Sequence, residues 1–389
     1  MPAGKAKIYD FIYGDSALKN NISIIPDGQF QDKMDREAVP FLMSVASSGY
    51  IKVKQTPEPF TDRRKSHTPS PSASRHKSPA QPLTGERSVK QMPSQTANQP
   101  ASHENGCLYY ESYRPSNATG AIVISHGFCE SAEKYKEVIY YFTKAGYQVY
   151  LAEHRGHARS LRETDHPNMV HIHRFADYVE DLHTFITQIV IPASRGLPLY
   201  LYAHSMGGAV GALYLETYPD IFRKAVLTAP MLGILLGSVP EPCVRALGRI
   251  MVSLHRANTY PPGQRPFQPG ERFENSCCTN YERFQYYQAK KEAEPLFQNS
   301  GSSYGWIYHS LNACHLITQK KNCAKITAPV LVFRSTCDTL VKASGIRRFV
   351  KNTPGARLID VDESRHEIYS SSCVVLENYY REIFSFLDT

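Results

Sequence analysis

Residues 199–215 read Leu-Tyr-Leu-Tyr-Ala-His-Ser-Met-Gly-Gly-Ala-Val-Gly-Ala-Leu-Tyr-Leu, and this stretch decides the fold. The apolar and aromatic run before Ser205 predicts a strand, and the small residues after it predict a helix. A serine between a strand and a helix is typical of a nucleophile elbow, a tight turn that lifts the serine oxygen out of the backbone. The turn needs small neighbours, which Ala203, Gly207 and Gly208 supply, although Gly is usual where Ala203 stands. An ordinary Ser-Gly turn would look similar, so the interpretation depends on further components.

A catalytic serine needs a histidine base and a carboxylate that orients the histidine. In the α/β-hydrolase order the carboxylate and the histidine follow the serine along the chain. Asp338 comes just after an apolar run at 329–335, and His366 follows a second run at 357–361. Both residues therefore lie past the carboxyl ends of expected strands, the edge at which open α/β sheets place their sites. We expect Ser205 as nucleophile, Asp338 as acid and His366 as base.

The fourth component is a pair of backbone N–H groups that bind the oxyanion. In this arrangement one N–H comes from the residue after the nucleophile and the other from a loop after an early strand. The apolar run 121–125 is followed by His126, Gly127 and Phe128. Gly127 fits a loop whose backbone approaches the substrate closely. We expect the N–H groups of Phe128 and Met206 to form the oxyanion hole.

Strands and helices alternate from residue 121 to residue 228, which predicts an α/β fold with a mainly parallel central sheet and helices on both faces. The alternation breaks after Pro230, where we expect a helical cap over the site. We divide the chain into an N-terminal extension of unknown role (1–48), a first strand (49–54), a disordered basic Ser/Pro-rich insertion (55–105), the core (106–230 and 326–389) and the cap (231–325).

Charge is distributed unevenly along the chain. The net charge is +8, and residues 61–90 hold seven Lys/Arg against two Asp/Glu, or +5. This stretch has almost no large apolar residues, so it cannot bury enough surface to offset its ordering entropy. Basic residues interleaved with aromatic ones, which would suggest nucleic-acid binding, do not occur. We expect the insertion to be disordered and expect no nucleic-acid partner.

The location of the protein follows from what the sequence lacks. No apolar stretch reaches the length of about 20 residues that a membrane span needs. The first residues lack the apolar run of a signal peptide. The nine cysteines are odd in number and scattered, which fits a reducing compartment. We expect a cytoplasmic protein, with peripheral membrane contact if its substrate is a lipid.

Several further motifs support a resemblance to a known family. By these motifs the chain, over roughly residues 106–389, resembles serine hydrolases of the α/β-hydrolase fold, in the group of monoacylglycerol lipases and bacterial lysophospholipases. The motifs are His126-Gly-Phe128, Glu153-His-Arg-Gly-His-Ala-Arg-Ser160, His173-Arg-Phe-Ala-Asp-Tyr-Val-Glu-Asp-Leu182, Leu227-Thr-Ala-Pro-Met-Leu-Gly233, Ser303-Tyr-Gly-Trp-Ile-Tyr-His-Ser310 and His366-Glu-Ile368. The resemblance supports the same triad and implies no metal or organic cofactor. It also implies a structural role for His171 and His173, whose H-x-H spacing could be mistaken for metal ligands.

The resemblance implies hydrolysis of an ester with one long acyl chain. The match to bacterial lysophospholipases, several of which also carry Ala at the position of Ala203, favours a lysophospholipid over a monoacylglycerol. Guanidinium groups bind phosphate bidentately, so six cap arginines are candidate phosphate ligands: Arg245, Arg249, Arg256, Arg265, Arg272 and Arg283. Small-peptide aminopeptidases and acyltransferases share the fold and the triad and remain alternatives. The complete triad argues against a non-catalytic lipid-binding scaffold.

Overall fold

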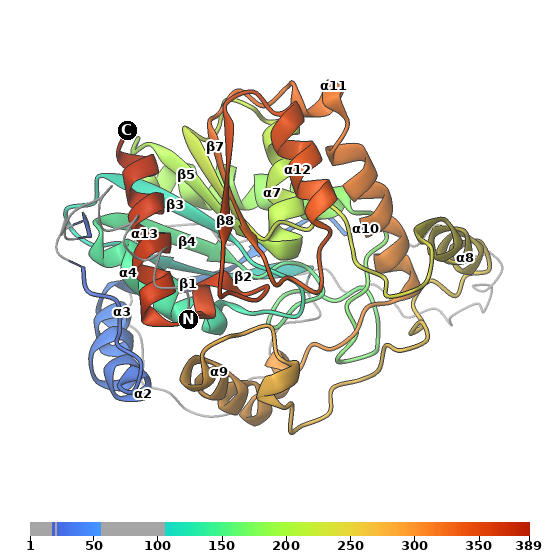
Figure 1. Cartoon of the computed structure of the whole chain (residues 1–389), viewed down its shortest axis with the longest axis horizontal. Helices are drawn as coiled ribbons and strands as arrows, with labels where there is room; N and C mark the ends of the chain where they lie inside the picture. The colour runs from blue at the N-terminus through green and yellow to red at the C-terminus, as the bar shows by residue number, and fades with distance from the viewer. Residues whose placement is uncertain (1–17, 20–21, 56–105) are drawn as a thin grey trace, which may run out of the picture.

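An eight-stranded sheet forms the centre of the computed structural model, which describes residues 18, 19, 22–55 and 106–389 (Figure 1). The strand order is β1-β2-β4-β3-β5-β6-β7-β8, in which β2 pairs antiparallel with β1 and β4 and all other pairs are parallel. The predicted mainly parallel sheet is therefore confirmed. The strands are β1 (Ala46–Lys52), β2 (Cys107–Tyr113), β3 (Gly120–Ser125), β4 (Tyr147–Ala152), β5 (Leu199–His204), β6 (Lys224–Thr228), β7 (Val330–Ser335) and β8 (Ala356–Val361).

The first strand begins and ends earlier than the predicted range of 49–54: β1 spans Ala46–Lys52. It pairs with β2 from Ala46 opposite Tyr113 to Lys52 opposite Cys107. The small polar residues at its start carry no apolar alternation, so backbone pairing with β2 sets the beginning of the strand. The two strands are consecutive in the sheet, as expected, and the predicted insertion between them lies almost wholly outside the described residues.

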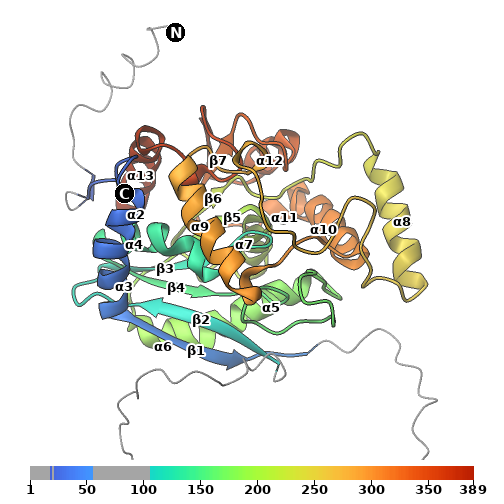
Figure 2. The ribbon, with the colours of Figure 1, turned by 90° about the horizontal axis from the view of Figure 1, so that it is seen from below.

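Helices cover both faces of the sheet (Figure 2), and the strands send alternate side chains into two apolar clusters. Val123 of β3 belongs to the first cluster, and its neighbours Ile122 and Ile124 belong to the second. The first cluster includes α5 (Ala176–Phe185), η5 (Ile186–Val190), α7 (Ser205–Thr217), α10 (Tyr304–Ile317) and α12 (Ala343–Asn352). The second includes α2 (Phe30–Lys33), η2 (Met34–Ala38), α3 (Val39–Val45), α4 (Lys136–Lys144) and α13 (Cys373–Asp388).

The N-terminal helices therefore belong to the core of the molecule, although the sequence assigned no role to residues 1–48. Phe30 and Leu42 are buried in the second cluster. Asp27, just before α2, accepts a hydrogen bond from Arg283 of the cap. The segment thus joins the sheet layer to the cap.

The range 231–325, expected to be the cap, contains helices with different neighbours. Helix α10 packs on α7 and buries Trp306 in the first cluster, so it belongs to the helical layer on that face. Helix α8 (Glu241–Ser253) lies against α10, and α9 (Tyr281–Ala293) lies against α2, both at the periphery of the sheet (Figure 1). The remaining short helices are η4 (Ala132–Tyr135), α6 (Ile191–Ser194), η6 (Phe273–Asn275), η7 (Pro295–Phe297), α11 (Lys320–Cys323) and η8 (Ile368–Ser370).

Candidate active site

The turn between β5 and α7 is as crowded as the sequence predicts. Ser205 has a φ of 51°, a left-handed backbone conformation that non-glycine residues rarely adopt. A Cβ atom on Gly207 would lie 2.1 Å from the carbonyl oxygen of Ser125, and one on Gly208 would lie 2.6 Å from Cβ of Pro230. Larger residues at either glycine would therefore push the turn away from β3 or Pro230.

The alanine that replaces the usual glycine before the serine is accommodated by the facing helix. Ala203 is fully buried, and a Cβ on Gly211 of α7 would lie 3.1 Å from the Cβ of Ala203. The missing side chain at Gly211 thus provides the room that Ala203 uses. This compensation explains why the departure from the usual pattern does not distort the elbow.

The structure brings together the three residues that the sequence proposed as a triad. The Oγ of Ser205 lies 2.7 Å from Nε2 of His366, and Nδ1 of His366 lies 2.7 Å from Oδ2 of Asp338. All three side chains come from loops or turns at the carboxyl ends of parallel strands: β5, β7 and β8. The geometry allows His366 to accept the serine proton while Asp338 fixes the orientation of the imidazole.

The carboxylate of Asp338 is held in its ionised form. Burial alone would raise the pKa of Asp338, but the hydrogen bond and charge of His366 lower it below its ordinary value. Its other oxygen accepts backbone hydrogen bonds from Leu340 at 2.8 Å and Val341 at 3.0 Å. The carboxylate is thereby fixed in position and accepts a hydrogen bond from the Nδ1–H of His366.

The two residues expected to form the oxyanion hole lie in different elements: Met206 follows Ser205 in α7, and Phe128 lies in the loop after β3. Met206 is the second residue of α7, where a backbone N–H has no partner within its own helix. Phe128 follows Gly127 in the loop after β3, and its ring packs on Trp306 with 4.2 Å between centroids. Both residues thus lie at the chain positions where α/β hydrolases have their oxyanion donors.

The sequence did not reveal Glu130, a buried carboxylate that holds the loop of residues 126–128. This loop is called the oxyanion loop after its expected role. Glu130 accepts hydrogen bonds from the N–H of Gly127 at 2.6 Å, the hydroxyl of Tyr135 at 2.6 Å and the hydroxyl of Tyr369 at 2.7 Å. Burial would raise the pKa of Glu130, but nearby Lys134 and these hydroxyls hold it well below the ordinary value. One charge therefore ties the oxyanion loop to Tyr369, three residues after His366.

The loop that carries His366 is also fastened to the cap. The guanidinium of Arg365 donates to the carbonyl oxygens of Phe273 at 3.1 Å and Ser276 at 3.0 Å. The N–H of Glu367 donates to the carbonyl oxygen of Cys277 at 3.0 Å. The residues on either side of the candidate base are thus bonded to the cap loop before α9, which couples the position of His366 to that of the cap.

Three histidines of the sequence motifs, His126, His154 and His171, are hydrogen-bonded within the protein. His126 accepts a hydrogen bond at Nε2 from the N–H of His154 at 2.8 Å, so its Nδ1 carries the proton and donates to the carbonyl oxygen of Gly127. Burial lowers the pKa of both imidazoles. The Nδ1 of His171 lies 2.8 Å from Oγ of Ser303. Among the described residues, no group of three His, Cys, Asp or Glu side chains is arranged to hold a metal ion.

The candidate phosphate ligands of the cap differ in their surroundings. Arg283 is buried and forms ion pairs with Glu137 and Asp27, both at 2.8 Å, so the prediction of a free phosphate ligand is wrong there. Arg245 pairs with Glu241 on its own helix. Arg272 pairs with Glu274 at 3.4 Å. Arg249, Arg256 and Arg265 are exposed to solvent.

The fold and the Ser–His–Asp geometry together define a serine hydrolase of the α/β-hydrolase class. A family model described as "Serine aminopeptidase, S33" matches residues 116–371, which is more than half of the chain. The chain belongs to this family of α/β hydrolases, as the motifs had indicated.

Three relatives in sequence are named as lysophospholipases or as a monoacylglycerol lipase. The chain is 26% identical over 312 residues to a probable lysophospholipase L2 of Haemophilus influenzae, covering 80% of this chain and 92% of the relative. It is 40% identical over 124 residues to lysophospholipase L2 of Escherichia coli, covering 32% and 36%. A monoacylglycerol lipase of Mycolicibacterium smegmatis is 27% identical over 244 residues, covering 62% and 79%.

Solved structures agree on the fold. The monoacylglycerol lipase of Paleococcus ferrophilus superposes with a TM-score of 0.54 at 22% identity, covering 72% of this chain and 98% of that structure. The monoglyceride lipase of Saccharomyces cerevisiae gives a TM-score of 0.59 at 16% identity, covering 76% and 96%. At this identity the similarity confirms the predicted α/β-hydrolase fold.

The role of Glu130 can be tested by Glu130→Gln. Removing one partner from a buried charged network costs about 3–5 kcal/mol of folding free energy. We also expect kcat for a p-nitrophenyl ester to fall more than KM changes, because a displaced oxyanion loop weakens transition-state binding. Urea denaturation and steady-state kinetics measure the two effects.

Tyr369→Phe is the matched control, because it removes one hydrogen bond and keeps the carboxylate. We expect it to cost about 2 kcal/mol of stability, because one hydrogen bond to a charged group is lost, and to leave kcat nearly unchanged. If Glu130→Gln lost stability but retained full kcat, Glu130 would stabilise the fold without positioning the loop.

Proposed function

We propose that this chain hydrolyses lipids that carry a single acyl chain, with a lysophospholipid as the preferred substrate. The observation that carries the proposal is the pair of 2.7 Å contacts from Ser205 to His366 and from His366 to Asp338. The lysophospholipase and monoacylglycerol lipase relatives support the substrate class.

The reaction proceeds through an acyl-enzyme. Ser205 attacks the ester carbonyl while His366 takes the hydroxyl proton at Nε2, and Asp338 stabilises the imidazolium that forms. The N–H groups of Phe128 and Met206 bind the oxyanion of the tetrahedral intermediate. His366 then gives its proton to the leaving alcohol, and a water molecule, activated in the same way, releases the fatty acid. These steps need no metal or organic cofactor.

A monoacylglycerol lipase is the first alternative, since the same triad would cleave an ester of glycerol without a phosphate. An aminopeptidase is the second, because the family model carries that description and Glu271, an acidic residue of the cap, borders a cavity next to the site. A carboxylate in that place could hold a free amino terminus. An acyltransferase would share the acyl-enzyme and pass the acyl group to an alcohol.

A substrate panel with the Ser205→Ala variant tests the proposal. Fatty acid or amine release is measured from lysophosphatidylcholine, monoacylglycerol and an aminoacyl amide, with glycerol added as a competing acceptor. We expect lysophosphatidylcholine to be cleaved with the highest kcat/KM and Ser205→Ala to lower kcat by about six orders of magnitude.

Each other outcome supports a different reading. A far higher kcat/KM for monoacylglycerol would replace the proposed substrate, and cleavage of the aminoacyl amide alone would move the chain to the peptidases. Activity that survives in Ser205→Ala would show that Ser205 is not the nucleophile.

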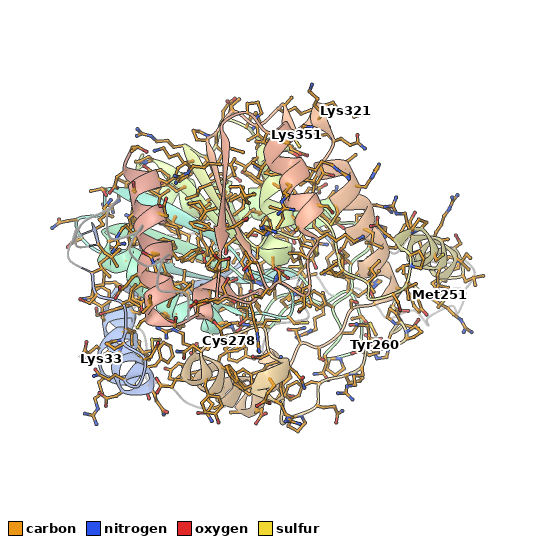
Figure 3. All side chains as sticks on the ribbon, viewed as in Figure 1. Lys33, Met251, Tyr260, Cys278, Lys321 and Lys351 are labelled. Carbon is orange, nitrogen blue, oxygen red and sulfur yellow. The ribbon has the colours of Figure 1, made fainter. Side chains whose placement is uncertain are left out.

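The substrate proposal extends to contact with lipid surfaces through α8. Leu247, Ile250 and Leu254 recur at helical spacing in the second half of α8 and at its C-cap, and are 43%, 53% and 61% exposed. The exposed Arg249 and Arg256 lie beside them in the sequence. Figure 3 shows Met251, on the same helix, at the outer edge of the molecule. Within the described ranges, no helix combines the length and apolar character needed to cross a bilayer.

We expect Ile250→Ser with Leu254→Ser to weaken binding to vesicles that contain anionic lipid by about tenfold or more, because two large apolar side chains lose their burial in lipid. Co-sedimentation measures the binding. Val374→Ser removes an apolar side chain that is 65% exposed on α13 and serves as the control. Unchanged vesicle binding of the double variant would exclude α8 as the membrane contact. All variants should cleave a soluble p-nitrophenyl ester equally, because the site itself is not altered.

A further inference from the structure

A partly enclosed cavity of about 180 Å³ lies between the cap and the core, and its lining includes chain neighbours of the site residues. Its wall includes Phe128 of the oxyanion loop and Glu367, the neighbour of His366. The opposite wall comes from α9, through Tyr287 and Lys291, and from Cys278 in the loop before it. Figure 3 shows Cys278 between α9 and the core. The cavity is thus connected to the site through Phe128, next to Gly127, and through Glu367, next to His366.

The four cationic side chains that line this cavity differ in whether they form an ion pair. Lys134, Lys136 and Arg283 are each engaged in ion pairs, with Glu367, Glu111 and Glu137 respectively. Lys291 makes no ion pair within the part of the chain that the structure describes, and its Nζ lies 5.5 Å from the ring centroid of Phe267. Lys291 is therefore the lining cation whose charge is available to a ligand.

The position of Lys291 places its charge near the oxyanion loop. Burial raises the pKa of the Cys129 thiol to about 12, and the ammonium of Lys291 is the strongest charge that opposes this rise. Cys129 directly follows Phe128, whose N–H is the expected oxyanion donor. An anionic group bound by Lys291 would consequently lie close to the ester that Ser205 attacks.

An acidic residue and aromatic rings complete the lining. Glu271 borders the cavity and, like Lys291, has no ion-pair partner within residues 18, 19, 22–55 and 106–389. The rings of Phe128, Tyr286 and Tyr287 contribute further wall. A cation, an anion and aromatic faces in one cavity match a zwitterionic group that contains a phosphate and an ammonium.

We propose that this cavity receives the head group of a lysophospholipid, with Lys291 binding the phosphate and Glu271 binding the ammonium of a choline or ethanolamine head group. The inference rests on the proposed function, since it assigns the polar part of the proposed substrate. In such a lipid only the glycerol carbons separate the phosphate from the acyl ester. A phosphate site beside the oxyanion loop would therefore allow the ester to reach Ser205. A monoacylglycerol presents only hydroxyls there and does not need Lys291.

The test compares two substrates with the same short acyl chain, kept below their aggregation concentrations so that surface binding does not contribute. For lysophosphatidylcholine, Lys291→Ala is expected to lower kcat/KM by about tenfold to hundredfold, mainly through KM, because a hydrogen bond to a charged group is lost. For the monoacylglycerol the change should stay within about twofold. Lys291→Arg should retain most of the activity, since guanidinium also binds phosphate.

Lys351→Ala is the matched control, because Lys351 is an exposed lysine of α12 that lies far from Cys278 (Figure 3). It should leave both substrates unaffected. Glu271→Gln should lower kcat/KM for lysophosphatidylcholine and leave that for lysophosphatidic acid, which lacks the ammonium, unchanged.

A second measurement follows binding without turnover. sn-Glycero-3-phosphocholine should inhibit the wild-type chain competitively and Lys291→Ala about tenfold more weakly. Equal losses for both substrates, or no loss for lysophosphatidylcholine, would overturn the head-group site. If the wild-type chain cleaved the monoacylglycerol and not lysophosphatidylcholine, the proposed substrate itself would fail.

Discussion

The close approach of α7 to the end of β3 is the constraint on which the site depends. Gly207 brings the start of the helix so near that a Cβ would lie 2.1 Å from the carbonyl oxygen of Ser125. This contact holds Ser205 in a left-handed conformation with a φ of 51°. It also places the N-terminus of α7 beside the loop that carries Phe128. Nucleophile and oxyanion loop are thus positioned by one packing contact, and strain at the serine is offset by the surrounding structure.

A buried carboxylate and a half-buried guanidinium hold the loops around this contact. Glu130 joins the oxyanion loop to Tyr369, and Arg365 joins the base loop to the cap. Because each charge is satisfied by hydrogen bonds, burial does not leave it unpaired, which would be costly. The cap is therefore bonded to the residue next to His366. A displacement of the cap near Ser276 would therefore act on His366 through its neighbour Arg365.

The sequence predicted the sheet, the elbow and the three residues that meet at the site, because these depend on local patterns and on the order of motifs along the chain. Glu130 could not be recognised, since its partner Tyr369 lies 239 residues away in the sequence. The weak hint was an acidic residue three positions after Gly127. Arg283 was misread because a sequence shows the charge of a side chain and not its partner. The N-terminal helices were missed because they pack on residues far away, such as those of α4 and α9.

The central claim is that Ser205 is a nucleophile activated by His366. The most direct measurement is covalent labelling by a fluorophosphonate, followed by mass spectrometry of the digested chain. We expect a single adduct, on Ser205, whose formation slows by about three orders of magnitude or more in His366→Ala, because the general base is lost. An adduct on another residue, or an unchanged labelling rate in His366→Ala, would contradict it.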